Sequence, residues 1–120
     1  MTVLAEKIYR TLRRRALTLK NPQLSYGYLC YLLAQRGIGI HHRDRRLSAA
    51  LGEVVRFCHS LRLPALSALV GRGDDRQMPG KSYYPIAHPQ HRKNSANLAI
   101  AWGNEVASVV KSRRSYPVKV

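Results

Sequence analysis

Acidic residues are scarce in this chain. Its 120 residues include 6 Asp and Glu against 21 Lys and Arg, which gives a formal net charge of +15 at pH 7. A positive surplus of this size repels itself and weakens the compact state. Phosphate groups relieve that repulsion and release counterions when they bind, so their binding is strong and salt-dependent. The composition therefore predicts an anionic partner, with nucleic acid first and an acidic protein surface as the alternative.

Cysteine is scarce as well, and long apolar runs are missing. Cys30 and Cys58 are too few for a disulfide framework and fall in apolar periodic segments, so we expect reduced core residues. The first residues form no long apolar stretch, so we expect no signal peptide, no membrane partner and a cytoplasmic location, with the nucleoid included. A hydrophobic fraction of 45% predicts one folded domain over residues 1–120.

Apolar residues at helical spacing predict a first helix over residues 2–19. Its apolar stripe runs through Leu4 and Leu12, and Asn21-Pro22 ends it. The opposite side of this helix is basic and carries Arg10, Arg13 and Arg14. An amphipathic helix of this kind packs its apolar stripe on a core and leaves the basic side exposed.

Three further helices are predicted. The second begins at the N-cap Ser25 and ends at Gly37. The third covers residues 44–61 and has the clearest apolar stripe, formed by Leu47, Leu51, Val54, Val55, Cys58 and Leu61. The last follows a cap at Asn94 or Ser95, and its stripe is formed by Leu98, Trp102, Val106, Val109 and Val110. Residues 115–120 are expected to form a basic tail.

A small β-ribbon is predicted between the third and last helices. Residues 66–70 read as a buried strand, residues 71–76 as a turn-rich tip, and residues 82–86 as the return strand. Such a ribbon depends on the helices for stability. The second and third helices are expected to be joined by a short connection, as in a helix-turn-helix. The predicted fold class is therefore mainly α with a small β-ribbon, similar to a winged helix-turn-helix.

Three short motifs resemble a known family. Ser25-Tyr26-Gly27-Tyr28-Leu29, Arg45-Arg46-Leu47-Ser48-Ala49-Ala50-Leu51, and Leu63-Pro64 before the predicted strand resemble the DNA-binding domain of alkylguanine-DNA alkyltransferases and alkyltransferase-like proteins, over about residues 24–80. The resemblance implies DNA engagement, with Tyr26 helping to rotate a nucleotide and Arg45, next to Arg46, filling the base stack.

The family's reactive cysteine has no counterpart in this chain. Where the family has Pro-Cys-His-Arg, the sequence reads Leu66-Ser67-Ala68-Leu69-Val70. The thiolate that accepts the alkyl group is missing, so we expect no alkyl transfer and no enzymatic activity. The short motifs are also similar to small domains of phage and genome-defence proteins.

Basic residues at the start of the third helix are the central candidates for nucleic-acid contact. Arg43, Arg45 and Arg46 oppose the helix dipole, and a bound phosphate there would reverse the sign of that cost. The full set of predicted nucleic-acid-binding residues is Tyr26, Arg43, Arg45, Arg46, Ser48, Arg72, Arg76, Lys81, Arg92 and Lys93. The basic side of the first helix is expected to extend this surface.

Metal and acid–base chemistry find little support. The five histidines, His41, His42, His59, His88 and His91, fit no zinc signature, so we expect no metal and no cofactor. Asp74-Asp75 is a carboxylate pair in a turn-forming run, which indicates a turn rather than catalysis.

Two alternatives to DNA binding stay open. One is a small basic phage-type inhibitor or adaptor that docks on a host nucleic-acid-processing or defence protein. The other is a ribonuclease that uses His41, His88, His91 and Lys93. The sequence leaves DNA against RNA, sequence specificity and oligomeric state undetermined.

Overall fold

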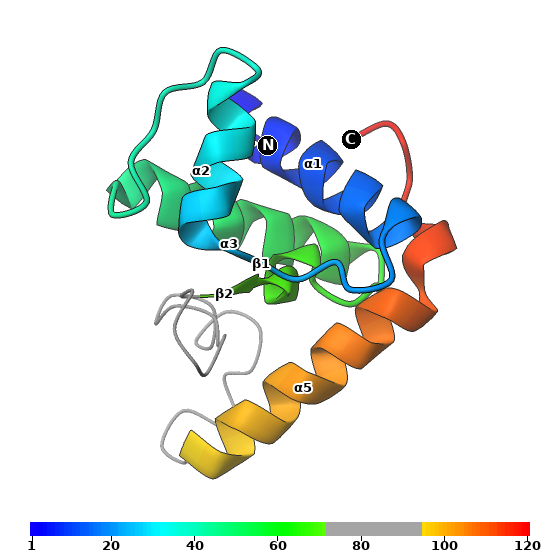
Figure 1. The fold of residues 1–120 in the computed structure, drawn as a ribbon. Coiled ribbons are helices and arrows are strands. Elements are labelled where there is room, and N and C mark those ends of the chain that lie inside the picture. The colour runs from blue at the N-terminus through cyan, green and yellow to red at the C-terminus, as the bar shows by residue number, and fades with distance from the viewer. Residues whose placement is uncertain (72–94) are drawn as a thin grey trace.

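The computed structural model describes residues 1–71 and 95–120, and most of these residues lie in helices (Figure 1). The elements in chain order are α1 (Val3–Thr18), β1 (Leu24–Ser25), α2 (Tyr26–Ala34), α3 (Arg45–Ser60), the 3-10 turn η1 (Leu66–Leu69), β2 (Val70–Gly71), α5 (Ser95–Lys111) and the 3-10 turn η3 (Arg113–Ser115). Within this part of the chain, no helix is long and apolar enough to cross a membrane.

Three helices begin at side-chain caps. The Thr2 hydroxyl accepts a hydrogen bond from the Ala5 backbone N–H at 3.2 Å, and Ser25 accepts one from the Tyr28 N–H at 3.0 Å. Asp44 caps α3 in the same way. Each side chain satisfies an N–H group that the helix itself leaves without a partner. The predicted starts of the first three helices are confirmed.

Two helices end in the same backbone motif. After α2, the Gly37 N–H bonds the Ala34 carbonyl and the Ile38 N–H bonds the Leu33 carbonyl, both at 3.0 Å, with Gly37 at φ +83°. These are the paired bonds of a Schellman motif, which requires a left-handed residue where glycine is favoured. α3 ends with the same bonding, but Arg62 occupies the left-handed position at φ +59°. The predicted ending at Gly37 is confirmed, and Arg62 marks a strained equivalent.

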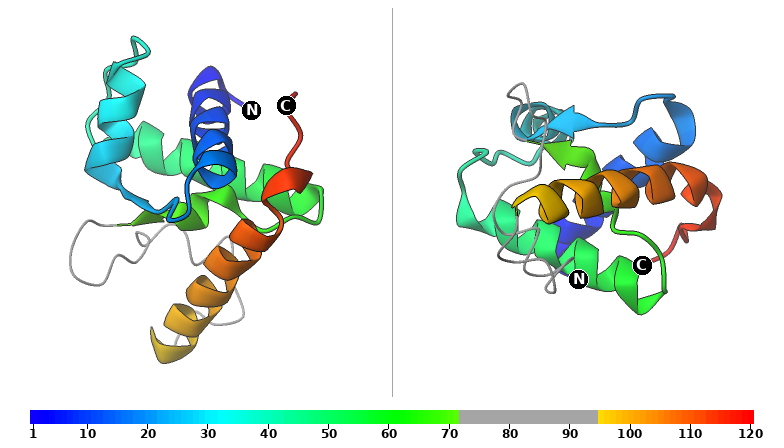
Figure 2. Two further views of the ribbon diagram at one scale, coloured as in Figure 1. Left: turned by 45° about the vertical axis from the view of Figure 1, so that its right-hand side comes forward. Right: turned by 90° about the horizontal axis from the view of Figure 1, so that it is seen from below.

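The core forms where α1, α3 and η1 meet. The side chains of Ile8, Leu12, Val54, Cys58 and Leu66 are all fully buried there. α2 packs on α1 and on the two short strands, whereas α3 packs mainly on α1 and η1 (Figures 1 and 2). The amphipathic stripes therefore face one shared interior, as the periodicity predicted.

The predicted strand over residues 66–70 is wrong for its first four residues. Leu66–Leu69 form a 3-10 turn, and only Val70–Gly71 form a strand, which pairs in parallel with Leu24–Ser25. The Ser67 hydroxyl donates to the Leu51 carbonyl at 2.9 Å and fixes the turn on α3. A short apolar run buried on all sides fits a strand or a helical turn equally well, so periodicity could not separate them.

The expected helix-turn-helix connection is also wrong. Ten residues, 35–44, separate the end of α2 from the start of α3. A helix-turn-helix has a turn of about three or four residues. The ribbon tip and the return strand at residues 82–86 lie outside the described residues. The observed fold is therefore mainly helical with a small two-stranded parallel sheet.

The segment predicted as a basic tail is anchored to the domain. Tyr116 is 2% exposed, and its hydroxyl donates to the Pro64 carbonyl. The Tyr9 hydroxyl donates to the Pro117 carbonyl at 2.6 Å, and Arg13 Nε donates to the Tyr116 carbonyl at 3.0 Å. These contacts hold the C-terminal segment against α1 (Figure 1).

The last helix, α5, lies across η1. Trp102 Nε1 donates to the Ala68 carbonyl at 2.8 Å, and the Glu105 carboxylate accepts from the Ala65 N–H at 2.7 Å. His59 lies 3.1 Å from the same carboxylate. A half-buried Trp102 is thus tied to the domain through its polar edge.

Candidate nucleic-acid interface

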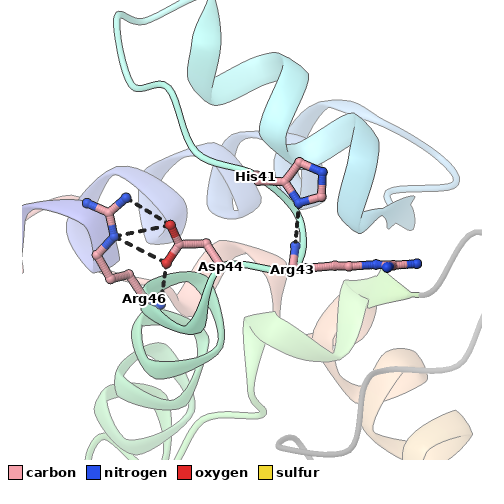
Figure 3. Close-up of polar contacts among 4 residues, drawn as sticks. All are labelled: His41, Arg43, Asp44 and Arg46. Carbon is pink, nitrogen blue, oxygen red and sulfur yellow. Dashed lines mark hydrogen bonds and ion pairs between the residues drawn. The ribbon is translucent and has the colours of Figure 1, made fainter.

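The start of α3 gathers four of the predicted binding residues, Arg43, Arg45, Arg46 and Ser48. The Asp44 carboxylate accepts from the Arg46 backbone N–H at 2.9 Å and from Arg46 Nη2 at 2.8 Å (Figure 3). Hydrogen bonds from the Arg46 side chain, and then from its backbone, lower the pKa of Asp44 to about 2. The Asp44 carboxylate therefore offsets part of the positive charge of Arg46, and the conflict with the helix dipole that the sequence indicated is reduced.

Arg43 and Arg45, the two chain neighbours of Asp44, are left exposed. Figure 3 shows the Arg43 side chain extending away from Asp44, on the side opposite Arg46. Within the described residues, no hydrogen bond or ion pair engages the guanidinium group of Arg43 or Arg45. Two exposed guanidinium groups without a partner among the described residues therefore lie at the beginning of α3.

The backbone before α3 is held by histidine. His41 Nδ1 accepts a hydrogen bond from the Arg43 N–H at 3.1 Å, and the rings of His41 and His42 lie 4.2 Å apart (Figure 3). The Asp44 N–H bonds the His41 carbonyl at 2.9 Å. These bonds form a turn that fixes the backbone from which the Arg43 side chain extends.

The exposed face of the first α3 turns carries small side chains next to Arg45. Ser48 and Ala49 are exposed, and they follow Arg45 by three and four residues. Residues at these spacings share one helix face. A large flat ligand could therefore reach Arg45 and the α3 backbone without meeting bulky side chains.

Tyr26 lies apart from this face in the chain and in its packing. It opens α2 and is half-buried, with its ring packed against the core. Next to it, Tyr28 and Tyr31 are 46% and 56% exposed, with ring centroids 5.7 Å apart, and the Arg15 guanidinium lies 5.5 Å from the Tyr28 centroid. The structure thus exposes Tyr28 and Tyr31 more than Tyr26, the tyrosine to which the resemblance gives a role.

Half of the predicted binding residues lie outside the described part of the chain. These are Arg72, Arg76, Lys81, Arg92 and Lys93. Four other residues considered in the sequence analysis, His88, His91, Asp74 and Asp75, also lie outside it. The structure describes the remaining five, of which Arg43, Arg45, Arg46 and Ser48 come together at the start of α3.

The basic side of α1 does not extend this surface. Figures 1 and 2 show the second half of α1 and the C-terminal segment on the side of the molecule opposite the start of α3. Arg10, Arg13 and Arg14 instead line a groove together with Lys119. Sequence reasoning missed this grouping because the partner segment follows more than 100 residues later.

The cysteines show no nucleophilic character. Cys58 is fully buried, and burial raises the pKa of its thiol to about 11. Burial also raises the pKa of Cys30. Both thiols are free, as predicted. A thiol becomes a nucleophile only as the thiolate, and these surroundings oppose thiolate formation. Among the described residues, no group of three His, Cys, Asp or Glu side chains could hold a metal ion.

No family model, no curated protein and no solved structure matches this chain. The resemblance to the alkyltransferase DNA-binding domain accordingly depends on three short motifs.

Proposed function

We propose that this domain binds nucleic acid, duplex DNA first, through the start of α3 and without chemistry of its own. The observation that carries the proposal is the pair of exposed, unpaired guanidinium groups of Arg43 and Arg45 beside a small helix face. Recognition helices commonly contact base edges with their N-terminal residues. Arginine forms paired hydrogen bonds with guanine in the major groove and also binds phosphate.

The charge balance supports an anionic partner. The described residues include four acidic side chains, and three of them accept hydrogen bonds from other groups of the protein. Asp44 caps α3, Glu53 accepts from the backbone N–H and hydroxyl of Thr2, and Glu105 accepts from the Ala65 N–H. Among the described residues, most arginines and lysines therefore have no carboxylate partner, and a polyphosphate partner supplies that missing negative charge.

The finer form of the proposal pairs the start of α3 with a β-ribbon, as a winged helix does, although the connection between α2 and α3 is longer than a helix-turn-helix turn. In it, Arg45 and Ser48 approach the bases, and Arg72, Arg76 and Lys81 hold the backbone from the ribbon. Arg92 and Lys93 add phosphate contacts. Tyr26 takes the nucleotide-rotating role that the resemblance implies.

A salt-dependent binding titration tests the proposal. Fluorescence anisotropy with a labelled duplex, run in parallel on single-stranded DNA and RNA, compares Arg45→Ala with Arg56→Ala. Both arginines are exposed and lie on α3, about three turns apart. We expect Arg45→Ala to weaken duplex binding about 5- to 100-fold and to lower the salt slope by about one, while Arg56→Ala changes affinity less than about threefold. Equal losses from the two variants would contradict the assignment to the start of α3.

The exposed tyrosine pair on α2 favours a second candidate, a small phage-type inhibitor or adaptor that binds an acidic protein. Tyrosine and arginine are enriched where protein interfaces gain most of their affinity. Tyr28, Tyr31 and Arg15 form such a group on one exposed face. A Tyr28→Ser/Tyr31→Ser variant that keeps duplex binding but loses an acidic protein partner would support this candidate. The absence of any nucleic-acid binding near physiological salt would point the same way.

A further inference from the structure

A groove lies between the second half of α1 and the C-terminal segment. It has a volume of about 330 Å³ and is lined by Arg10, Arg13, Arg14 and Lys119, with Leu17 and Val118 as apolar walls. Arg10, Arg13 and Arg14 share one face of α1 because they are three and four residues apart. Lys119 comes from the other wall, so the cations surround the space from two elements.

The C-terminal wall is fixed in place by hydrogen bonds on both sides of Pro117. The Tyr9 hydroxyl donates to the Pro117 carbonyl at 2.6 Å, and Arg13 Nε donates to the Tyr116 carbonyl at 3.0 Å. The Tyr116 hydroxyl is tied to the Pro64 carbonyl. The groove is therefore a built feature, because its second wall is anchored directly before Val118 and Lys119.

Among the residues that the structure describes, no carboxylate lines this groove. Arg10 and Arg14 are exposed, lie one helical turn apart and repel each other. Arg13 Nε donates to the Tyr116 carbonyl, and the two Nη groups of Arg13 make no hydrogen bond within the described residues. Three arginines thus line one groove, and guanidinium groups are the donors that phosphate oxygens accept best.

We propose that this groove is a phosphate-binding site, separate from the surface at the start of α3. The volume lies at the lower end of small-ligand pockets, which suits a phosphate with one attached sugar-sized group. Two sources carry that chemistry, a free polyphosphate of the nucleotide type and the backbone of a nucleic-acid segment. Leu17 and Val118 form apolar contacts with the carbon part of either one.

The site stands on the opposite side of the molecule from the start of α3 (Figures 1 and 2). The longest dimension of the protein is 38 Å. A straight duplex held at α3 does not also occupy the groove, so the two sites bind separate ligands or separate segments. The groove does not depend on the proposed DNA-binding function.

Calorimetric titration of the whole chain tests the proposal. The background is an Arg43→Ala/Arg45→Ala variant, which removes the α3 surface, and the ligands are inorganic triphosphate and a single-stranded tetranucleotide. Arg10→Gln/Arg14→Gln is compared with Arg36→Gln/Arg56→Gln, which removes the same charge from exposed residues outside the groove. We expect binding at one site per chain, weakened at least tenfold by the groove variant and less than twofold by the control.

The tighter ligand identifies the source of the phosphate: the triphosphate indicates a free polyphosphate, and the tetranucleotide indicates a backbone. Absence of binding by both ligands at low salt would overturn the proposal, and so would equal losses in the groove variant and the control. If the double groove variant does not fold, Lys119→Gln replaces it, and the NMR signal of the Arg13 Nε–H must move on ligand addition. Loss of duplex binding at α3 with triphosphate binding retained would separate this site from the proposed function.

Discussion

Replacing Tyr116 with phenylalanine tests how the C-terminal segment is held. The ring is 2% exposed, and its hydroxyl donates to the Pro64 carbonyl, 52 residues earlier in the chain. Phenylalanine keeps the ring packing and removes only that hydrogen bond. The substitution therefore leaves the Pro64 carbonyl partly buried and without this hydrogen-bond donor.

The magnitude follows from the cost of a partly buried polar group without a partner. Such a group costs about 1–3 kcal/mol, and we expect Tyr116→Phe to lower the free energy of unfolding by about 2 kcal/mol. Urea unfolding followed by circular dichroism measures this as a lower midpoint with an unchanged slope. Because the segment also forms one wall of the α1 groove, triphosphate affinity should fall as well.

Tyr28→Phe is the matched control. Tyr28 is 46% exposed, and the substitution leaves its ring and the contact with Arg15 in place. We expect a change below about 0.5 kcal/mol, as for exposed positions in general. If Tyr116→Phe were as stable as Tyr28→Phe, the hydroxyl contact would not be what anchors the C-terminal segment.

Three further outcomes are expected. Asp44→Ala removes the cap of α3 and frees Arg46 from its carboxylate partner. The thermal midpoint should therefore fall in calorimetry, while duplex affinity at low salt rises roughly two- to fivefold. A fall in both the midpoint and the affinity would contradict the placement of the binding surface. Arg62→Gly relieves a left-handed backbone at φ +59° and should stabilise the protein by about 1 kcal/mol in urea unfolding, whereas a destabilised variant would refute the strain. Burial, and then the nearby Cys58, raises the pKa of Tyr9 to about 12, while the unfolded chain loses this proton near pH 10. The contribution of Tyr9 to the free energy of unfolding, taken as the difference from Tyr9→Phe, should therefore be steady below pH 10 and fall by up to about 3 kcal/mol toward pH 12. Tyr9→Phe should flatten this decline, which unfolding curves at pH 9, 10 and 11 would show.

The helices were predictable because their signals are local. The stripes of α1 and α3 repeat within one helix, and Ser25 and Asp44 cap through bonds to residues two or three positions away. Gly37 likewise ends α2 through neighbouring carbonyl groups. Local sequence is sufficient for such elements because every partner lies within one or two turns.

The non-local elements were predictable only in part. Residues 66–69 are apolar and buried on all sides, so the sequence could not distinguish a strand from the 3-10 turn that Ser67 fixes on α3. The glycines at positions 37 and 39 predicted a turn or loop over residues 37–43, and the structure has a connection over residues 35–44. Only its length, which exceeds that of a helix-turn-helix turn, was not predicted, because Ile38 and Ile40 pack partly against the core. Of the candidate site, the grouping of Arg43, Arg45 and Ser48 followed from the helix start alone.

The sequence by itself determined the charge, the helical stripes and the basic start of α3, since each depends on residue type or on near neighbours. The pairing of Asp44 with Arg46 rather than Arg43 is also local, but the order of residues leaves it open because side-chain direction selects between the two arginines. Only the tertiary structure decided the groove beside α1. Its walls are joined by the bonds from Tyr9 and Arg13 to residues more than 100 positions away, and no local pattern encodes a contact across that distance.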